Sequence, residues 1–335
     1  MSISETAARI AALGAGSPVR VADAIEAGIT RSALRAACAG GLLARPAHGY
    51  VAPIVRSQDD DEVFAARCLA LLHRRPHAVL SHSTASRILH LPTAAGTSRT
   101  IHCIDPNPRR IPGVVVHRGL VPASEVVEIN GLRLTSLLRT AVDLARSLPL
   151  PQALVTMDAA VRRRTIDLNE HVRSPDHRRV EDRHAQMQAK AELEEIVARC
   201  ARHPGADRAR AAMRAASPLA ESAAESRSRG HLLLAGIEPL GLQVRVRDAD
   251  GRERRLDFLL APGLAGEVDG LVKYDGPEGV RQLREEKTRD LLLERVGVRT
   301  LRWTGVEVWR DPDSVVSLVA HALAHHAAAR RRMAS

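Results

Sequence analysis

The feature that most constrains the fold is a Pro-Gly turn between two strand-like segments near the C-terminus. "RERRLDFLL" precedes Pro262-Gly263, and "AGEVDG" follows it. This dipeptide favours a tight turn, because proline fixes its own φ and glycine accepts a positive φ. The two segments are therefore predicted to pair as antiparallel strands, which brings Asp257 roughly opposite Glu267.

The second strand of this hairpin carries two like charges on one face. Alternate side chains of a strand share a face, so Glu267 and Asp269 point the same way, and Lys273 joins them if the strand continues past Gly270. Opposed carboxylates about 5 Å apart destabilise a sheet unless a cation lies between them. Mg²⁺, or Mn²⁺ in its place, takes such oxygen ligands. The alternative is a hairpin whose charges simply face solvent.

The elements around the hairpin follow a definite order. Residues 222–335 read as helix, three strands, helix, strand and closing helix, an αβββαβα order whose helices end at Gly236 and Gly297. With "LDF", "EVDG" and "KY", and nine residues between Asp257 and Glu267, this order resembles the PD-(D/E)xK nuclease superfamily. It is most similar to domains related to the very-short-patch repair (Vsr) endonuclease.

The nuclease resemblance implies roles for five residues. It implies Asp257 and Glu267 as metal ligands, Lys273 as a charge stabiliser and Glu225 as a frequent helix glutamate of these domains. Asp269 departs from the family pattern, because it stands where a lysine or a histidine is expected. Glu225 has a second explanation, since Ser222 and Glu225 have the spacing of a capping box.

The N-terminal residues 1–52 read as three short helices followed by a β-wing, the winged helix-turn-helix order. Gly28 ends the second helix, and Thr30 is placed to cap the third. Arg31 and Arg35 share one face of this third helix, where a helix that reads the major groove carries basic side chains. Arg45, in the predicted wing, completes the candidate DNA contacts. The alternative is a small helical bundle with solvated arginines.

Residues 60–168 form a mixed α/β stretch. Its histidines His82, His102 and His117 lack tight ligand spacing and are interpreted as satisfied structural residues, and Arg139 and Asp143 as a helical ion pair. Residues 169–221 read as an exposed linker with short connecting helices.

"GITRSALRAACAGGLLARPAHGYVAP", "AVLSHSTASRIL" and "LTSLLRTAVDLA" resemble the AbiEi-family antitoxins and transcriptional regulators of type IV toxin-antitoxin systems. This resemblance implies DNA as a partner, and a cognate toxin or another protein as a further one. The predicted fold class is multidomain α/β: a winged helix, a middle α/β domain and a C-terminal αβββαβ core like that of restriction endonucleases.

Charge and composition narrow the functional classes. The net charge of +10 and the pI near 10.5 favour a polyanionic partner. Four widely spaced cysteines, no signal peptide and no long apolar run predict a cytoplasmic protein without a membrane partner. Two functions remain: a Mg²⁺-dependent DNA endonuclease, or a non-catalytic antitoxin-type regulator with a degenerate nuclease fold. A purely structural α/β protein is the third alternative.

Overall fold

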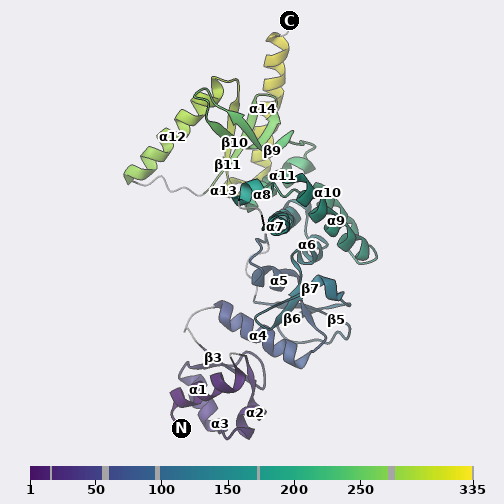
Figure 1. The fold of residues 1–335 in the computed structure, drawn as a ribbon, viewed down its shortest axis with the longest axis vertical. Helices are drawn as coiled ribbons and strands as arrows, with labels where there is room; N and C mark the ends of the chain where they lie inside the picture. The colour runs from purple at the N-terminus through teal and green to yellow at the C-terminus, as the bar shows by residue number, and fades with distance from the viewer. Residues whose placement is uncertain (16, 55–59, 95–98, 172–173, 271–275, 334–335) are drawn as a thin grey trace. The chain divides into compact units, whose positions relative to one another are not determined.

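The computed structural model describes residues 1–15, 17–54, 60–94, 99–171, 174–270 and 276–333. It is a mixed helix and sheet structure with three sheets, as the predicted α/β class requires (Figure 1). The chain forms two compact units. The first contains residues 1–85 and 97–136, and the second contains residues 86–96 and 137–335. The predicted middle segment 60–168 therefore contributes to both units.

The first unit begins with three helices and a small antiparallel sheet in the order β1-β3-β2. Its elements are α1 (Ile3–Gly14), β1 (Val19–Arg20), α2 (Val21–Glu26), α3 (Arg31–Ala39), β2 (Leu43–Ala44) and β3 (Tyr50–Pro53). The Thr30 hydroxyl accepts a hydrogen bond from the Ala33 backbone N–H at 3.2 Å, which confirms the predicted cap of α3. Gly28 and Gly49 have the positive φ that the predicted turns require. The two-residue strand β1 was not predicted.

A five-stranded mixed sheet completes the first unit, in the order β6-β5-β4-β8-β7. The elements in chain order are α4 (Asp60–Arg74), β4 (Val79–Leu80), α5 (His82–Ile88), β5 (Ile101–Asp105), β6 (Val114–Arg118), η1 (Ala123–Glu125), β7 (Val126–Ile129) and β8 (Leu132–Thr135). The strands β5 and β6 run parallel, and β6 lies at one edge of the sheet.

The second unit begins with packed helices. They are α6 (Leu137–Ala145), α7 (Leu150–Leu168), α8 (Asp176–Arg179), α9 (Arg183–Arg199), α10 (Ala206–Ala215) and α11 (Ala223–Leu234). The predicted ion pair Arg139–Asp143 is present at 3.0 Å within α6. The helix α9 is longer than expected and includes residues interpreted as exposed linker. Ala185, Ala189 and Leu193 are spaced four residues apart and are all buried, so they form one apolar face of the helix. Two of the three are alanines, and a pattern based on large apolar residues does not detect such a face.

A mixed four-stranded sheet follows, in the order β12-β11-β10-β9. The elements are β9 (Gly241–Arg247), β10 (Glu253–Ala261), β11 (Leu264–Asp269), α12 (Gly276–Glu294), β12 (Arg299–Thr304), α13 (Gly305–Arg310) and α14 (Pro312–Met333). They follow the predicted order, with α13 as an addition. Phe258 and Trp303 stack in the core of this sheet, and the Trp303 ring covers Gly266 so closely that no Cβ fits there.

None of the helices in the described part of the chain is both long enough and apolar enough to cross a lipid bilayer.

Candidate functional site

The hairpin β10–β11 brings Asp257 and Glu267 to neighbouring positions. Gly263 makes the turn with a φ of +84°, and Phe258 pairs with Gly266, the residues next to the two carboxylates. Asp257 Oδ2 accepts a hydrogen bond from the Val268 backbone N–H at 2.9 Å, which ties the aspartate to the opposite strand. The Pro-Gly turn thus produces the predicted cross-strand relation.

Glu225 points toward this hairpin from the first turn of α11. Ser222 caps the helix by accepting from the Glu225 backbone N–H, but the Glu225 carboxylate accepts from the Glu221 N–H and from Gln243 Nε2. It therefore does not complete the capping box considered above. Burial, with the nearby charge of Asp257, raises the pKa of Glu225 to about 7.

Gln243 on β9 joins the two acids, and the sequence patterns did not indicate it. Its Nε2 donates at 3.0 Å to Glu225 Oε2 and at 3.0 Å to Asp257 Oδ1. Its backbone has a φ of +52°, a strained conformation for a residue other than glycine. Its Oε1 is buried and has no hydrogen-bond partner in the described part of the chain. The amide therefore presents its donor to the two carboxylates, while its acceptor stays unpaired.

Two arginines supply the positive charge next to Glu267. Arg289 on α12 binds Glu267 Oε1 at 2.6 Å, and Arg302 on β12 binds Glu267 Oε2 at 3.0 Å. Burial raises the pKa of Glu267, while the two guanidinium groups oppose that shift. Arg289 thus reaches from α12 toward the hairpin.

Arg302 also binds the residue that departs from the family pattern. Its Nη1 lies 2.8 Å from Asp269 Oδ1, and its Nη2 lies 2.8 Å from Asp290 Oδ1. Burial opposes the charge of Arg302, but these carboxylates outweigh it and raise its pKa. Lys273 lies outside the residues that the structure describes. Among the described residues, the cationic side chain that contacts Asp269 is Arg302.

Most of these side chains border an open polar pocket of about 510 Å³, but the buried Glu225 is not among the residues that line it. Its lining includes Gln243, Asp257, Glu267, Asp269, Arg289 and Arg302. Among the described residues, the carboxylates here do not form a trio with oxygens all within 4.8 Å of one another. The site therefore combines two carboxylates held by neutral donors, Glu225 and Asp257, with three carboxylates held by Arg302, which are Glu267, Asp269 and Asp290.

The candidate DNA contacts lie in the first unit, on α3 and the wing. Arg31, Arg35 and Arg45 are all exposed, and the buried side of α3 packs through Leu34 and Ala37. The helix thus turns its basic face to solvent, an arrangement that suits contacts to phosphate.

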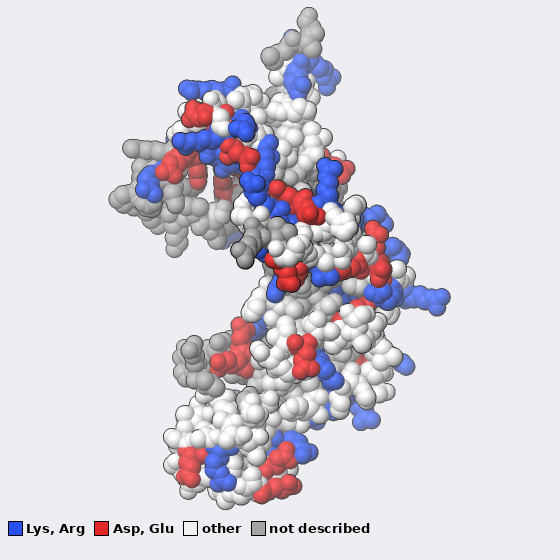
Figure 2. Space-filling model, in the orientation of Figure 1, with Lys and Arg blue, Asp and Glu red and all other residues white. Residues whose placement is uncertain are grey.

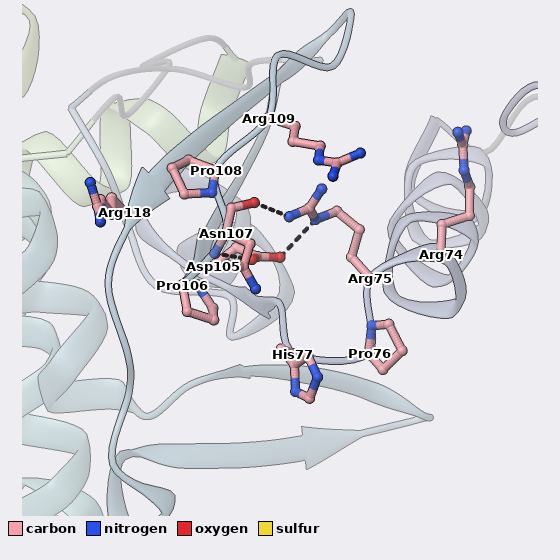
Figure 3. A pocket seen from close by; sticks show the side chains of 10 residues that line it. All are labelled: Arg74, Arg75, Pro76, His77, Asp105, Pro106, Asn107, Pro108, Arg109 and Arg118. Atoms are coloured by element: carbon pink, nitrogen blue, oxygen red, sulfur yellow. Dashed lines mark hydrogen bonds and ion pairs between the residues drawn. The ribbon is translucent and has the colours of Figure 1, made fainter.

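A second basic feature of the first unit is a pocket of about 680 Å³ between the end of α4 and the loop after β5 (Figure 3). Arg75 fills one wall by binding Asp105 at 2.7 Å. Arg74, Arg109 and Arg118 contribute three further guanidinium groups to the lining. Sequence reasoning overlooked this pocket because its arginines come from three separate segments.

No protein-family model matches the chain. Two proteins of Mycobacterium tuberculosis are similar to it: the uncharacterized protein MT2308 of strain CDC 1551 / Oshkosh and the uncharacterized protein Rv2248 of strain ATCC 25618 / H37Rv. Each is 28% identical over 250 residues, which are 74% of this chain and 82% of the relative. Neither name states an activity, so the relatives add no chemistry to the site.

Proposed function

We propose that the chain is a DNA-binding protein whose second unit hydrolyses DNA phosphodiester bonds with Mg²⁺ or Mn²⁺. The observation that carries the proposal is the meeting of Glu225 and Asp257, two carboxylates from different elements, on the amide of Gln243. Like charges are held together here by neutral donors, and the pKa of Glu225 is raised first by burial and second by the charge of Asp257. A divalent cation reverses the sign of that interaction.

The donors fit a hard cation. Mg²⁺ prefers oxygen ligands, and the carboxylates of Glu225 and Asp257, which meet on Gln243 Nε2, supply them. Asp257 and Glu267 are the residues we assign to the metal, and Glu225 neighbours Asp257 through Gln243. When bound, the metal would lower the pKa of a water and balance charge on the phosphate.

The arginines of the pocket have their own role in this proposal. Arg289 and Arg302 hold Glu267 in place and set positive charge at the edge of the pocket. Donors fixed before the reaction stabilise negative charge that develops on a phosphate. They thus take the part that the nuclease resemblance assigns to Lys273.

The alternative proposal is a non-catalytic regulator of the antitoxin type, with DNA and a cognate toxin as partners. The observation in its favour is the position of Arg302, which already neutralises Glu267 and Asp269. A site balanced by its own arginine has less need of a metal ion. Both proposals assign DNA contact to Arg31, Arg35 and Arg45, and both place the protein in the cytoplasm.

Plasmid nicking separates the two proposals. The full chain is incubated with supercoiled DNA and Mg²⁺ or Mn²⁺, and Asp257→Asn is compared with Asp250→Asn. The control makes the same chemical change at an exposed turn before β10. We expect Asp257→Asn to reduce nicking by about 100-fold or more, the scale on which a single electrostatic group acts in catalysis.

Two results would contradict the nuclease. One is nicking that Asp257→Asn retains in full, because the activity then comes from elsewhere. The other is no cleavage of duplex, mismatched, single-stranded or branched DNA with either metal, which favours the regulator.

A further inference from the structure

Three histidines of the first unit lie together, although they are far apart in the sequence. His82 begins α5, His102 lies on β5 and His117 lies on β6. One ring nitrogen from each lies within 4.8 Å of the other two. Their spacing in the sequence did not indicate this cluster, because the sheet brings together residues that lie far apart along the chain. The interpretation as structural residues stays a prediction.

The parallel pairing of β5 and β6 brings two of the rings together. Ile104 pairs with His117, and His102 lies two residues before Ile104, so both histidines share one face of the sheet. His102 Nδ1 lies 3.2 Å from His117 Nε2. Two nitrogens on one tetrahedral zinc, at 2.0–2.1 Å from the metal, lie about 3.3 Å apart. The observed separation of the two ring nitrogens matches this distance.

The turn between β4 and α5 brings in the third ring. The Ser81 N–H donates to the His102 carbonyl at 3.0 Å, and the Thr84 hydroxyl accepts from the His102 N–H at 2.8 Å. These bonds fix the turn on β5. His82 has a φ of +51°, a conformation that is uncommon for residues other than glycine and that clusters at functional sites.

We propose that His82, His102 and His117 bind a divalent transition metal, most simply Zn²⁺, with water in the fourth position. Three imidazoles with an open position are a donor set typical of zinc. The Ser81 hydroxyl lies 2.9 Å from His82 Nδ1 and orients that ring, so we assign its Nε2 to the metal. His102 and His117 are half-buried, which leaves the ion a path from solvent.

Cys103 is not a fourth ligand, because successive side chains of a strand alternate and it lies on the face of β5 opposite His102. The rings of His82 and His117 stack with centroids 3.7 Å apart. Metal binding turns one of them so that the two lone pairs converge.

Cobalt titration of the tag-free full chain tests the site. Co²⁺ bound to a tetrahedral site absorbs in the visible range, and Zn²⁺ added afterwards displaces it. We expect one bound ion per chain, a higher melting temperature with Zn²⁺, and a loss of affinity of about 100-fold or more in His117→Ala. Ser81→Ala should lose affinity by about 10- to 100-fold, as is usual for residues that orient a ligand.

The matched control is the double variant His321→Ala/His325→Ala, which removes a histidine pair on α14 whose ring centroids lie 4.3 Å apart. This variant should bind Zn²⁺ as the wild type does. Zn²⁺ binding lost in the control but kept in His117→Ala would overturn the proposal. Wild-type affinity no higher than that of His102→Gln/His117→Gln, with the far-UV circular dichroism of both proteins alike, would overturn it as well.

Discussion

At the scale of single residues, the pKa of Glu225 is shifted in an unusual direction for a carboxyl group. Most carboxylates in folded proteins have lowered pKa values, but burial beside Asp257 raises this one from 4.5 to about 7. The folded state therefore holds the proton more tightly than the unfolded chain. Its contribution to stability is complete below about pH 4.5 and is lost as the pH rises through about 7.

The corresponding prediction concerns Glu225→Gln measured in chelator. The rise in pKa from 4.5 to about 7 corresponds to about 3 kcal/mol. This group should therefore lower the free energy of unfolding of the wild type by roughly that amount between pH 4.5 and 8. The glutamine variant should lack this loss. Tryptophan fluorescence during urea unfolding is the measurement, because Trp303 and Trp309 both lie in the second unit.

The control for this prediction is Glu238→Gln, an identical change at an exposed position. It should keep the wild-type pH dependence. An unchanged slope in Glu225→Gln would show that the Glu225 carboxyl is not the group that titrates near pH 7.

At the scale of elements, the crossing of α7 and α11 depends on a glycine. A Cβ added at Gly230 would lie 2.4 Å from Pro151 Cα, a backbone atom that cannot rotate away. One residue earlier, Arg229 binds buried Asp158 at 2.7 Å, which fixes the two helices in register. A side chain at Gly230 therefore has to separate the helices and strain that ion pair.

Gly230→Ala should destabilise the second unit by about 1–3 kcal/mol through overpacking, despite the better helix propensity of alanine. Gly270→Ala is the matched control, because a Cβ there meets no atom of the described residues within 4 Å. The urea midpoint followed by tryptophan fluorescence gives the difference. Equal midpoints for the two variants would mean that α7 and α11 can move apart without a loss of stability, which contradicts the prediction.

How far the sequence could predict these elements depends on the range of the interactions. Local signals were sufficient for the Thr30 cap, the Gly28 turn and the Pro262-Gly263 hairpin, since each acts within a few residues. The partners of Glu267 were not predictable in this way. Arg302 reaches it through the parallel pairing of β11 and β12, and a parallel register leaves no turn signature in the sequence.

At the scale of the whole molecule, the net charge of +10 is the difference between 49 basic and 39 acidic side chains. On the face shown in Figure 2, basic and acidic side chains are interspersed over both units. Many arginines are already paired, as Arg20 is with Asp23 and Arg164 is with Glu192. Net charge alone therefore favours weak, general attraction to polyanions, and a specific DNA surface has to come from arginines that face solvent.

The DNA-binding proposal is testable through the salt dependence of affinity. Each phosphate contact contributes about 0.9 to the slope of log K against log salt, because neutralising a phosphate releases counterions. Arg31→Ala/Arg35→Ala should therefore weaken binding to duplex DNA and reduce that slope by about 2. The control Arg208→Ala/Arg214→Ala removes the same charge from exposed positions of α10. Fluorescence anisotropy at several salt concentrations distinguishes the two. If both double variants lower the slope equally, DNA affinity depends on the total charge of the protein, and α3 is not the recognition helix.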